Sequence, residues 1–406
     1  MGLLKKYLLL VVLVAFIFRI ILSLLPAFEY DQNSFRFWSI KLAEHGLSNF
    51  YSSDFFTNNP VGFFYLLWIV GSFITHFAPW INSNHQFFDL LLKLPANLAD
   101  ILTGILIFKI ILKKLNHQLA VLGFCLYVFN PAIFFNSSIW GQYDGIVALF
   151  LLAAFYLLEF RKMPEVAFVF YSLAWTFKPQ AIMLLPFIGL FMLIKYSPAK
   201  WLTSTITLAV TTILIYFPFS PNNPLAGLIS VNLGSTTLYN CTSCFAFNFW
   251  GMFGNWKSDL QSFLGIKYLY WAFILYLISL VSIFFFKPFL KRYNSPFFFI
   301  TAAMSAFAFF SLLTRMHERY LFPFFILFLI GAILLKSRVL LFFYVLVSLI
   351  YSLNLYVPYT YYNKQLNISL ILSSDLSGYT QQFSILSFLV FLALLSYYLK
   401  ILKRHN

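Results

Sequence analysis

The sequence predicts an all-α, polytopic transmembrane protein, and three observations support this fold class. The chain of 406 residues is 61% hydrophobic and 10% charged, whereas soluble domains are about half apolar and about a quarter charged. Apolar runs close to the roughly 20 residues that a bilayer-crossing helix needs recur along the whole chain. The 54 Phe, 25 Tyr and 9 Trp leave little sequence for a separate soluble domain.

The first expected element is an apolar helix over 7–25, which follows Lys5 and Lys6. Its run is too long for the core of a signal peptide and no small-residue cleavage site follows, so we expect a first spanning helix. Further apolar segments are expected at 61–78, 87–112, 119–138, 145–160, 166–177, 181–195, 201–219, 263–286, 296–313, 320–335, 339–356 and 383–399.

The net charge of +15 would suggest nucleic acid in a soluble chain, but here it predicts topology. Seventeen of the 27 Lys and Arg residues lie in short connections, which the positive-inside rule assigns to the cytoplasm. These connections contain Lys5, Lys6, Lys109, Lys113, Lys114, Arg161, Lys162, Lys195, Lys200, Lys287, Lys291, Arg292, Lys336, Arg338, Lys400, Lys403 and Arg404. No nucleic-acid partner is expected.

One apolar segment disturbs this assignment. Three segments lie between Lys6 and Lys113, although both residues should be cytoplasmic. We expect segment 61–78, which follows Pro60, to re-enter or to lie along the interface. About twelve crossings then remain, with both termini cytoplasmic, and the outer face receives 26–60, 139–144, 177–180, 220–262, 314–319 and 357–382.

The first outer loop, 26–60, contains Glu29 and Asp31 directly after the first helix. Residues 34–45 have the pattern of an imperfect amphipathic helix, of the kind that lies in the membrane interface. Such a helix would hold Asp31 at the lip of a cavity. A fully solvated Asp31 in an acidic helix cap is an equal alternative.

The turn at 139–144 carries Trp140, Gln142 and Asp144. An aromatic face, an amide and a carboxylate within a few residues suit the binding of a sugar ring. The alternative is an interfacial tryptophan followed by an aspartate that caps the next helix.

The turn at 177–180 holds Lys178, followed by Pro179 and Gln180. Pro179 should break the helix and direct Lys178 outwards, where its point charge suits an anionic ligand. Snorkelling of Lys178 to lipid phosphates is the alternative.

The turn at 314–319 concentrates charge, with Arg315, His317, Glu318 and Arg319. The planar guanidinium of arginine binds phosphate oxygens bidentately, and two arginines outside depart from the positive-inside bias. We therefore expect an anion site here, with an Arg–Glu ion pair of purely structural role as the alternative.

Other polar residues have more ordinary explanations. Arg19 could pair with Asp100 or with Asp31, and an intramembrane pair that fixes helix packing is the favoured interpretation of Arg19, Lys93 and Asp100. Cys241 and Cys244 lack the partners for a metal site, so they form a disulfide or remain two thiols.

Four motifs, in this order along the chain, resemble the GT-C superfamily of integral-membrane glycosyltransferases. They are Asp31, the string from Trp140 to Asp144, Lys178 with Pro179 and Gln180, and the string from Thr314 to Tyr320. Within it, the chain looks like bacterial mannosyltransferase-like proteins related to the GPI-anchor second-mannose transferase. The resemblance covers most of the chain, and its motifs are specific only in combination.

The resemblance implies an inverting transfer of a hexose, mannose by this likeness, from a polyprenyl-phosphate donor to a glycan, lipid or protein acceptor outside the membrane. Asp31 would be the general base and Asp144 the second carboxylate. The donor phosphate would contact Arg315, His317, Arg319 and Lys178, and the sugar or acceptor would contact Trp140, Gln142, Gln180 and Glu318. Some relatives carry Asp-x-Asp where this chain has Asp31, Gln32 and Asn33, which argues against a metal.

The organisation expected from this resemblance is one membrane domain over 1–406. Residues 1–220 would form the GT-C-like catalytic module and 221–406 additional helices, in a bacterial plasma membrane. A flippase for lipid-linked sugars, or another multi-pass transporter, is the competing function. It would use intramembrane charges along a pathway and favours internal repeats, which the sequence does not show.

Overall fold

The structure is a computed structural model that describes residues 2–48, 50–51, 57, 59–237, 239–284 and 295–404. The predicted basic residues Lys287, Lys291 and Arg292 lie outside the described residues, as do the side chains of Lys5 and Lys6. The longer helices are α1 (Gly2–Ser23), α2 (Glu29–His45), α3 (Val61–Phe77), α4 (His85–Lys114), α5 (His117–Val128), α7 (Asp144–Tyr156), α8 (Pro164–Phe177), α9 (Leu185–Lys195), α10 (Pro198–Tyr216), α11 (Pro224–Thr237), α12 (Tyr268–Phe284), α14 (Ser295–Leu312), α15 (Phe322–Leu334), α16 (Arg338–Gln365) and α17 (Thr380–Arg404).

Short elements complete the described chain. The helical ones are α6 (Pro131–Phe134) and the turns η1 (Pro79–Ser83), η2 (Phe135–Trp140), η3 (Leu157–Arg161), η4 (Pro179–Leu184), η5 (Trp250–Phe253) and η6 (Ser377–Tyr379). The strands are β1 (Ser243–Cys244), β2 (Ser262–Phe263), β3 (Ile266–Lys267) and β4 (Met316–His317). β1 pairs in parallel with β4, and β2 with β3 in an antiparallel hairpin.

The all-α class is confirmed, and several helices have the length and composition of membrane spans. Among the described residues, five helices are long and apolar enough to cross a membrane. A sixth span is possible where α5 and the continuous segment Pro131–Trp140 form a pair bent by 41°. The bend follows from Asn130 and Pro131, because proline cannot continue the hydrogen-bond ladder of α5.

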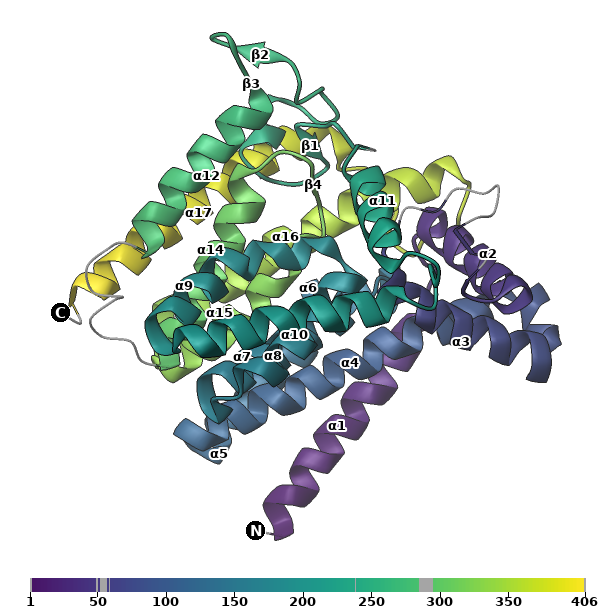
Figure 1. Ribbon diagram of the computed structural model, residues 1–406, viewed down its shortest axis with the longest axis horizontal. Helices are drawn as coiled ribbons and strands as arrows, with labels where there is room; N and C mark the ends of the chain where they lie inside the picture. The colour runs from purple at the N-terminus through teal and green to yellow at the C-terminus, as the bar shows by residue number, and fades with distance from the viewer. Residues whose placement is uncertain are drawn as a thin grey trace.

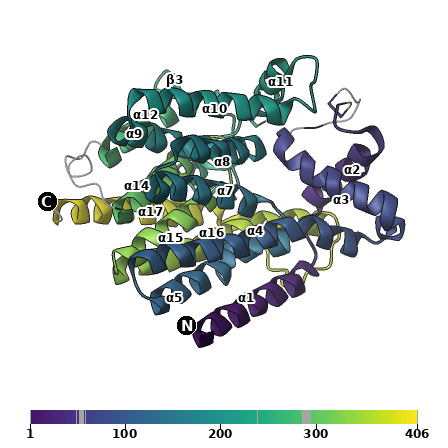
Figure 2. The same ribbon diagram turned by 60° about the horizontal axis from the view of Figure 1, so that its bottom comes forward.

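The centre of the molecule is formed by α14, α15, α4 and α7, which pack against one another. Almost every side chain of α15 is buried, as expected for a helix that is apolar on all sides. By contrast, α10 turns apolar side chains outwards, with Leu202 63% and Leu214 64% exposed. Figure 2 shows α10 and α1 on opposite sides of the assembly. Exposed apolar side chains on outer helices are typical of lipid contact.

The helices α2 and α3 pack on each other at one end of the assembly, beyond α1 and α4 (Figure 1). Gly71 permits this contact, because a Cβ atom there would lie 1.9 Å from the backbone oxygen of Ser39. Since α3 has only 17 residues, it is one of the shorter apolar helices. That segment 61–78 does not cross the membrane stays a prediction.

The expected outer loops contain more helix than the sequence predicted. In 26–60, α2 begins at Glu29 and not at 34, because Glu29 and Asp31 stabilise the first turn against the helix dipole. The loop 220–262 contains α11. The predicted start of the loop 357–382 is wrong, because α16 continues through Pro358 to Gln365.

The basic turns and the candidate site residues occupy different ends of the structure. Lys113 and Lys114 at the end of α4 lie over the ring of Phe160, and the Ser295 hydroxyl donates to Glu159 over 2.6 Å. The turns α4–α5 and η3–α8 and the start of α14 therefore meet. Figure 1 shows both chain termini towards this side and the β1–β4 pair and α2 away from it.

Candidate functional site

Four connections between helices bring the predicted site residues together. They are the start of α2, the turn from η2 to α7, the junction of α8 with η4, and the segment from α14 to α15. Each lies where a helix ends, so backbone and side-chain polar groups are available there without breaking a helical ladder.

Asp31 lies in the first turn of α2 and is half-buried. Its Oδ2 accepts hydrogen bonds from Trp140 Nε1 at 2.8 Å and from the Gln142 side-chain amide. Two N–H donors thus hold this carboxylate oxygen in one direction. Among the described residues, no hydrogen bond is made to the other oxygen, Oδ1. The carboxylate is therefore oriented through Oδ2, while Oδ1 keeps its acceptor capacity.

The N-terminal part of α2 is fixed by Arg36. Its guanidinium donates to Asp89 Oδ1 at 2.5 Å, to Asn33 Oδ1 at 2.6 Å and to the Glu29 carboxylate. These contacts tie α2 to α4, which holds Asp31 in place against the η2–α7 turn.

Trp140 is the last residue of the π-helical segment η2, and Gln142 follows it in the turn to α7. Such segments are rare and occur frequently at functional sites. The segment η2 is followed by Gly141, whose φ of +90° favours glycine and where a Cβ atom would meet the Gln32 amide at 2.3 Å. Trp140 also stacks on Phe28 with ring centroids 4.3 Å apart. The indole is thus held by packing as well as by its hydrogen bond to Asp31.

A continuous polar network extends from Asp31 to the α8–η4 junction. Gln142 donates to Asp31, and its Oε1 accepts from Lys178 Nζ at 3.0 Å. Lys178 Nζ also lies 2.8 Å from Asp144 Oδ1, which accepts a hydrogen bond from Gln180 over 3.2 Å. The Gln142 amide therefore joins a carboxylate to a lysine through its two ends.

Lys178 is held over an aromatic ring. Its ammonium lies 4.3 Å from the centroid of the Tyr143 ring, and Tyr143 stacks on Phe63 at 3.7 Å. Burial lowers the pKa of Lys178 to about 8, although the adjacent Asp144 carboxylate acts in the opposite direction. Lys178 is consequently a cation whose charge can change near physiological pH.

Glu318 and Arg319 form the second charged part of the site. Arg319 Nη1 lies 2.6 Å from Glu318 Oε1, and His317 Nδ1 lies 3.8 Å from Glu318 Oε2. Burial acts to raise the pKa of Glu318, but Arg319 and His317 outweigh it and lower the pKa to about 2. Glu318 is therefore ionised at neutral pH.

Arg319 belongs to the same electrostatic cluster as the network around Asp31. Burial disfavours its charge, but Glu318 outweighs this effect and raises the pKa of Arg319. Asp31 and Asp144 contribute to the same increase. Two cations, Lys178 and Arg319, are thus shared among three carboxylates.

Some polar atoms of this cluster have no partner. Within the described residues, Asp144 Oδ2 and Arg319 Nε are buried and make no hydrogen bond. Buried polar atoms are nearly always hydrogen-bonded, because an unsatisfied group costs about 1–3 kcal/mol. Among the described residues Arg19 Nε is buried without a partner too, so such an atom alone does not identify a ligand site. Asp144 Oδ2 and Arg319 Nε do retain hydrogen-bonding capacity for a polar ligand or water.

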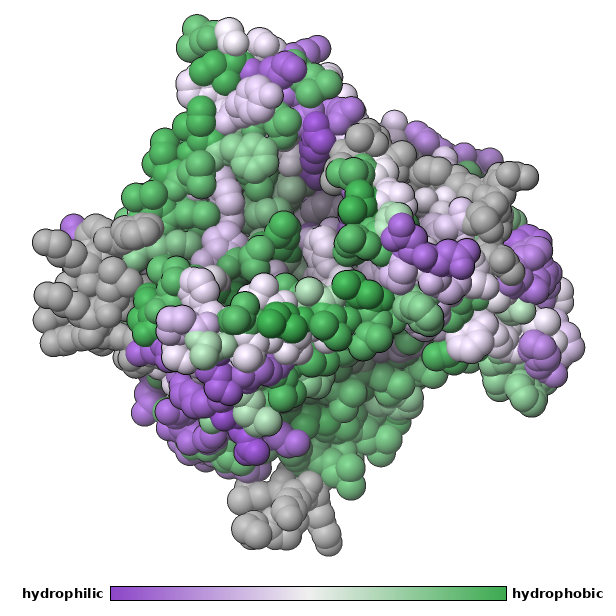
Figure 3. Space-filling model, in the orientation of Figure 1, coloured by the Kyte–Doolittle hydropathy of each residue, from purple (hydrophilic) through white to green (hydrophobic). Residues whose placement is uncertain are grey.

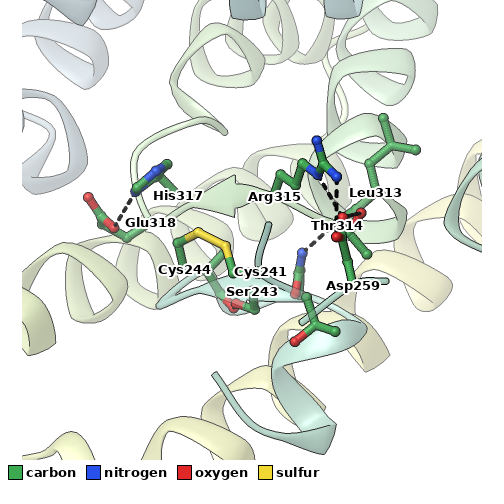
Figure 4. The surroundings of a disulfide bond; sticks show 12 residues. Cys241, Ser243, Cys244, Asp259, Leu313, Thr314, Arg315, His317 and Glu318 are labelled. Atoms are coloured by element: carbon green, nitrogen blue, oxygen red, sulfur yellow. Dashed lines mark hydrogen bonds and ion pairs between the residues drawn. A yellow bond between two sulfur atoms is a disulfide. The ribbon is translucent and has the colours of Figure 1, made fainter. Parts of the chain in front are cut away.

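Arg315 points away from this cluster. Its guanidinium binds Asp259 bidentately, with Nε to Oδ2 at 2.7 Å and Nη2 to Oδ1 at 3.2 Å, and Thr314 donates to the same carboxylate. Figure 4 shows this pair on one side of the disulfide and His317 with Glu318 on the other. A phosphate contact of Arg315 stays a prediction.

The cysteines form the disulfide Cys241–Cys244, which resolves the alternative that the sequence left open. In the β1–β4 pair, Cys244 is opposite His317, and the Arg315 amide donates to the Cys241 carbonyl over 2.9 Å. The disulfide loop thereby supports the segment that carries the second charged part.

Arg19 is the partner of Asp100, with Nη1 2.8 Å from Oδ2, and both side chains are fully buried. Lys93 Nζ donates to the carbonyl oxygens of Ser23 and Leu25, each at 3.0 Å, and so caps the end of α1. The predicted pairing of Arg19 with Asp100 is confirmed.

Two residues that contact the predicted site residues were missed from sequence: Asp259, which binds Arg315, and Tyr143, whose ring lies beside the Lys178 ammonium. Asp259 is one of only 12 acidic residues and lies in a loop expected outside, so a signal existed. Tyr143 lies between the candidates Gln142 and Asp144 and was not itself chosen as one. No group of three His, Cys, Asp or Glu side chains in the described ranges could hold a metal ion. The side-chain amide of Gln32, the residue after Asp31, donates a hydrogen bond to the Gly141 carbonyl.

Fold and site together define a helical protein with membrane-capable helices and a buried cluster of carboxylates and cations at one end. Comparison with protein-family models found no match, and comparison with curated proteins found none either.

Proposed function

We propose that the chain is an integral-membrane glycosyltransferase of the GT-C type. It transfers a hexose from a polyprenyl-phosphate-sugar donor to a hydroxyl group of an acceptor at the outer membrane face. The observation that carries this proposal is the bridge formed by Gln142 between Asp31 and Lys178. It places a half-exposed carboxylate and a buried cation in one rigid network.

The chemistry of the transfer requires few groups. A phosphate leaves without being protonated when cations stabilise its negative charge, so the reaction needs one base and a cationic site. Lys178 and Arg319 are the cations of the cluster, and the unpartnered Arg319 Nε is available for a phosphate oxygen. Arg315 is already neutralised by Asp259 and is not assigned to the phosphate.

In the proposed step, Asp31 Oδ1 removes the proton from the acceptor hydroxyl. The hydroxyl oxygen forms a bond to the anomeric carbon while the bond from that carbon to the phosphate oxygen breaks. The lipid phosphate leaves towards Lys178 and Arg319, and the configuration inverts. Asp144 holds Lys178 in position, with its unpartnered Oδ2 directed to a sugar hydroxyl.

The membrane arrangement proposed with this function has about twelve crossings and both termini in the cytoplasm. Three turns rich in Lys and Arg, α4–α5, η3–α8 and α9–α10, meet through Lys113 and Lys114 over Phe160 and through the Lys200–Glu165 ion pair, which supports their assignment to the cytoplasm by the positive-inside rule. The cluster around Asp31 would then face the exterior of a bacterial plasma membrane.

Transport is less well supported. A transporter should direct intramembrane charges into a pathway, whereas Arg19, Asp100 and Lys93 are used in contacts between α1, α4 and the end of α5.

The test is reconstitution of the full chain in vesicles with a panel of polyprenyl-phosphate hexoses and saccharide acceptors. We expect transfer by the wild type and a loss of about 100-fold or more for Asp31→Asn, in line with removal of a general base.

The matched control is Glu44→Gln, which removes an exposed carboxylate of the same helix that pairs with Lys41. It should transfer at the wild-type rate. Full transfer by the Asp31→Asn variant would exclude Asp31 as the base. Absence of transfer from every donor, with donor lipid instead exchanged between leaflets, would support the transporter.

A further inference from the structure

A row of aromatic side chains lies beside the charged cluster. We call Tyr30, Tyr362, Phe245, Trp256 and Tyr239 the aromatic row. Its members come from the start of α2, the end of α16 and the segment from 239 to 256, so residues far apart in sequence are brought together.

The rings of the row are in contact from one end to the other. Centroid distances are 5.4 Å between Tyr30 and Tyr362, 5.8 Å from Tyr362 to Phe245, 6.0 Å from Phe245 to Trp256 and 6.3 Å from Trp256 to Tyr239. Phe245 is buried beneath the others and supports them. The row is therefore a packed surface.

Both ends of the row reach the charged cluster. Tyr30 is adjacent to the proposed base Asp31 in α2, and Tyr239 lies edge-on to His317 with ring centroids 4.8 Å apart. The aromatic row thus adjoins the charged cluster.

The row keeps large faces exposed although its members pack together. Tyr30 and Trp256 are each 46% exposed and Tyr239 is 37% exposed. Figure 3 shows this face of the molecule hollowed beside α11, in the area where Figure 1 draws β4, the strand of His317. A belt of interfacial anchors would be spread around the outer helices, whereas these five rings are in contact with one another.

We propose that the aromatic row binds the sugar rings of a saccharide acceptor, an assignment that rests on the proposed function. Pyranose rings present C–H groups on their faces, and the electron-rich faces of Tyr and Trp complement these groups. Tyr30 would hold the accepting sugar beside Asp31, and Trp256 and Tyr239 would hold sugars further from the reacting hydroxyl.

The proposal separates acceptor from donor in space. The donor phosphate is assigned to the largely buried cations Lys178 and Arg319, and the acceptor chain to the exposed rings Tyr30, Trp256 and Tyr239. Changes in the row should then affect acceptor binding and leave donor binding unchanged.

The test is saturation-transfer NMR, which measures how much magnetic saturation passes from the full-length protein in detergent micelles to a free saccharide. No sugar donor is present. The probes are mannotriose, maltotriose and chitotriose. We expect the wild type to transfer saturation to at least one of them. Trp256→Ala and Tyr239→Ala should each weaken binding about two- to tenfold, as for loss of one aromatic contact.

The matched control is Trp80→Ala, because Trp80 is 60% exposed and lies in η1, outside the row. It should bind the saccharide as the wild type does. Binding that Trp256→Ala and Tyr239→Ala leave unchanged, or no binding of any probe by the wild type, would overturn the assignment.

This experiment also separates the two proposals. Saccharide binding that depends on the row, in a chain that transfers no sugar, would contradict the transferase alone. Transfer that depends on Asp31, with an acceptor KM unchanged in Trp256→Ala, would contradict the aromatic row alone.

Discussion

The molecule contains two clusters of buried charge that are built differently. In the pair of Arg19 and Asp100, both carboxylate oxygens are used, one by Arg19 and one by the Tyr127 hydroxyl at 3.2 Å. In the cluster around Lys178, Asp31 and Asp144 each use one oxygen, and Asp144 Oδ2 is buried without a partner among the described residues.

The two clusters therefore differ in whether their carboxylates use all of their acceptor capacity within the protein. A charge that stabilises packing uses its acceptor capacity within the protein and is fully buried, as Asp100 does. In the second cluster some of that capacity is left over: Asp31 is half-buried with one oxygen unused by the described residues, and Asp144 Oδ2 is buried without a partner among them. The comparison predicts that changes in the first cluster lower stability, whereas changes in the second lower activity.

The largest effect is expected for Asp100→Asn. It leaves Arg19 charged and unpaired in the interior, which should lower the free energy of unfolding by about 3–5 kcal/mol. SDS titration of the protein in mixed micelles measures this change. Asp31→Asn, in the other cluster, should lower it by less than about 1 kcal/mol. Equal losses of stability in the two variants would remove the distinction between the clusters.

A similarly large effect, on the rate of transfer, is expected for Arg319→Gln. Removing a cation that stabilises the leaving phosphate should lower kcat by about 10²–10³. Arg319→Lys should recover part of the rate, because it restores the charge without the planar fork. Arg338→Gln, an exposed arginine at the start of α16, is the control and should leave kcat unchanged.

The pH dependence of transfer sharpens the role of Lys178. Its pKa of about 8 means that the ammonium is charged below pH 8 and loses its proton above it. If the charge stabilises the leaving phosphate, the rate should fall about tenfold per unit of pH well above 8. A Lys178→Arg variant stays charged and should lack this alkaline decrease. An identical decrease in both proteins would assign it to another group.

The smallest effect is expected for the pair of Arg315 and Asp259. Arg315→Gln and Asp259→Asn should each lower the free energy of unfolding by about 1–3 kcal/mol. The double variant should cost less than the sum, because both single changes break one interaction. Transfer should fall by less than about tenfold. A loss as large as that of Arg319→Gln would instead place Arg315 on the phosphate.

Part of this picture was predictable from sequence. The apolar runs predicted an all-α protein, and the few polar turns between them predicted that Asp31, Gln142, Asp144 and Lys178 would share one end. These predictions succeed because hydrophobic periodicity and the cost of burying charge act locally along the chain.

The pairing of charges was not predictable in the same way. Arg315 and Asp259 are 56 residues apart, and their contact depends on how the loop around the disulfide folds back on β4. The end of α16 was also misplaced, because Pro358 was expected to lie beyond the helix and instead lies within it. Tertiary packing decided both, and no local pattern reports it.

The redox state of Cys241 and Cys244 reports the compartment in which this loop of the protein folded. Disulfides form and persist in oxidising compartments, and Cys125 is a free cysteine in the same chain. Alkylation of unfolded protein taken directly from cells, followed by mass spectrometry, would count one modified cysteine if the loop with Cys241 is outside and three if it is cytoplasmic. The orientation of the whole chain can thus be measured on native material, without fusing a reporter to it.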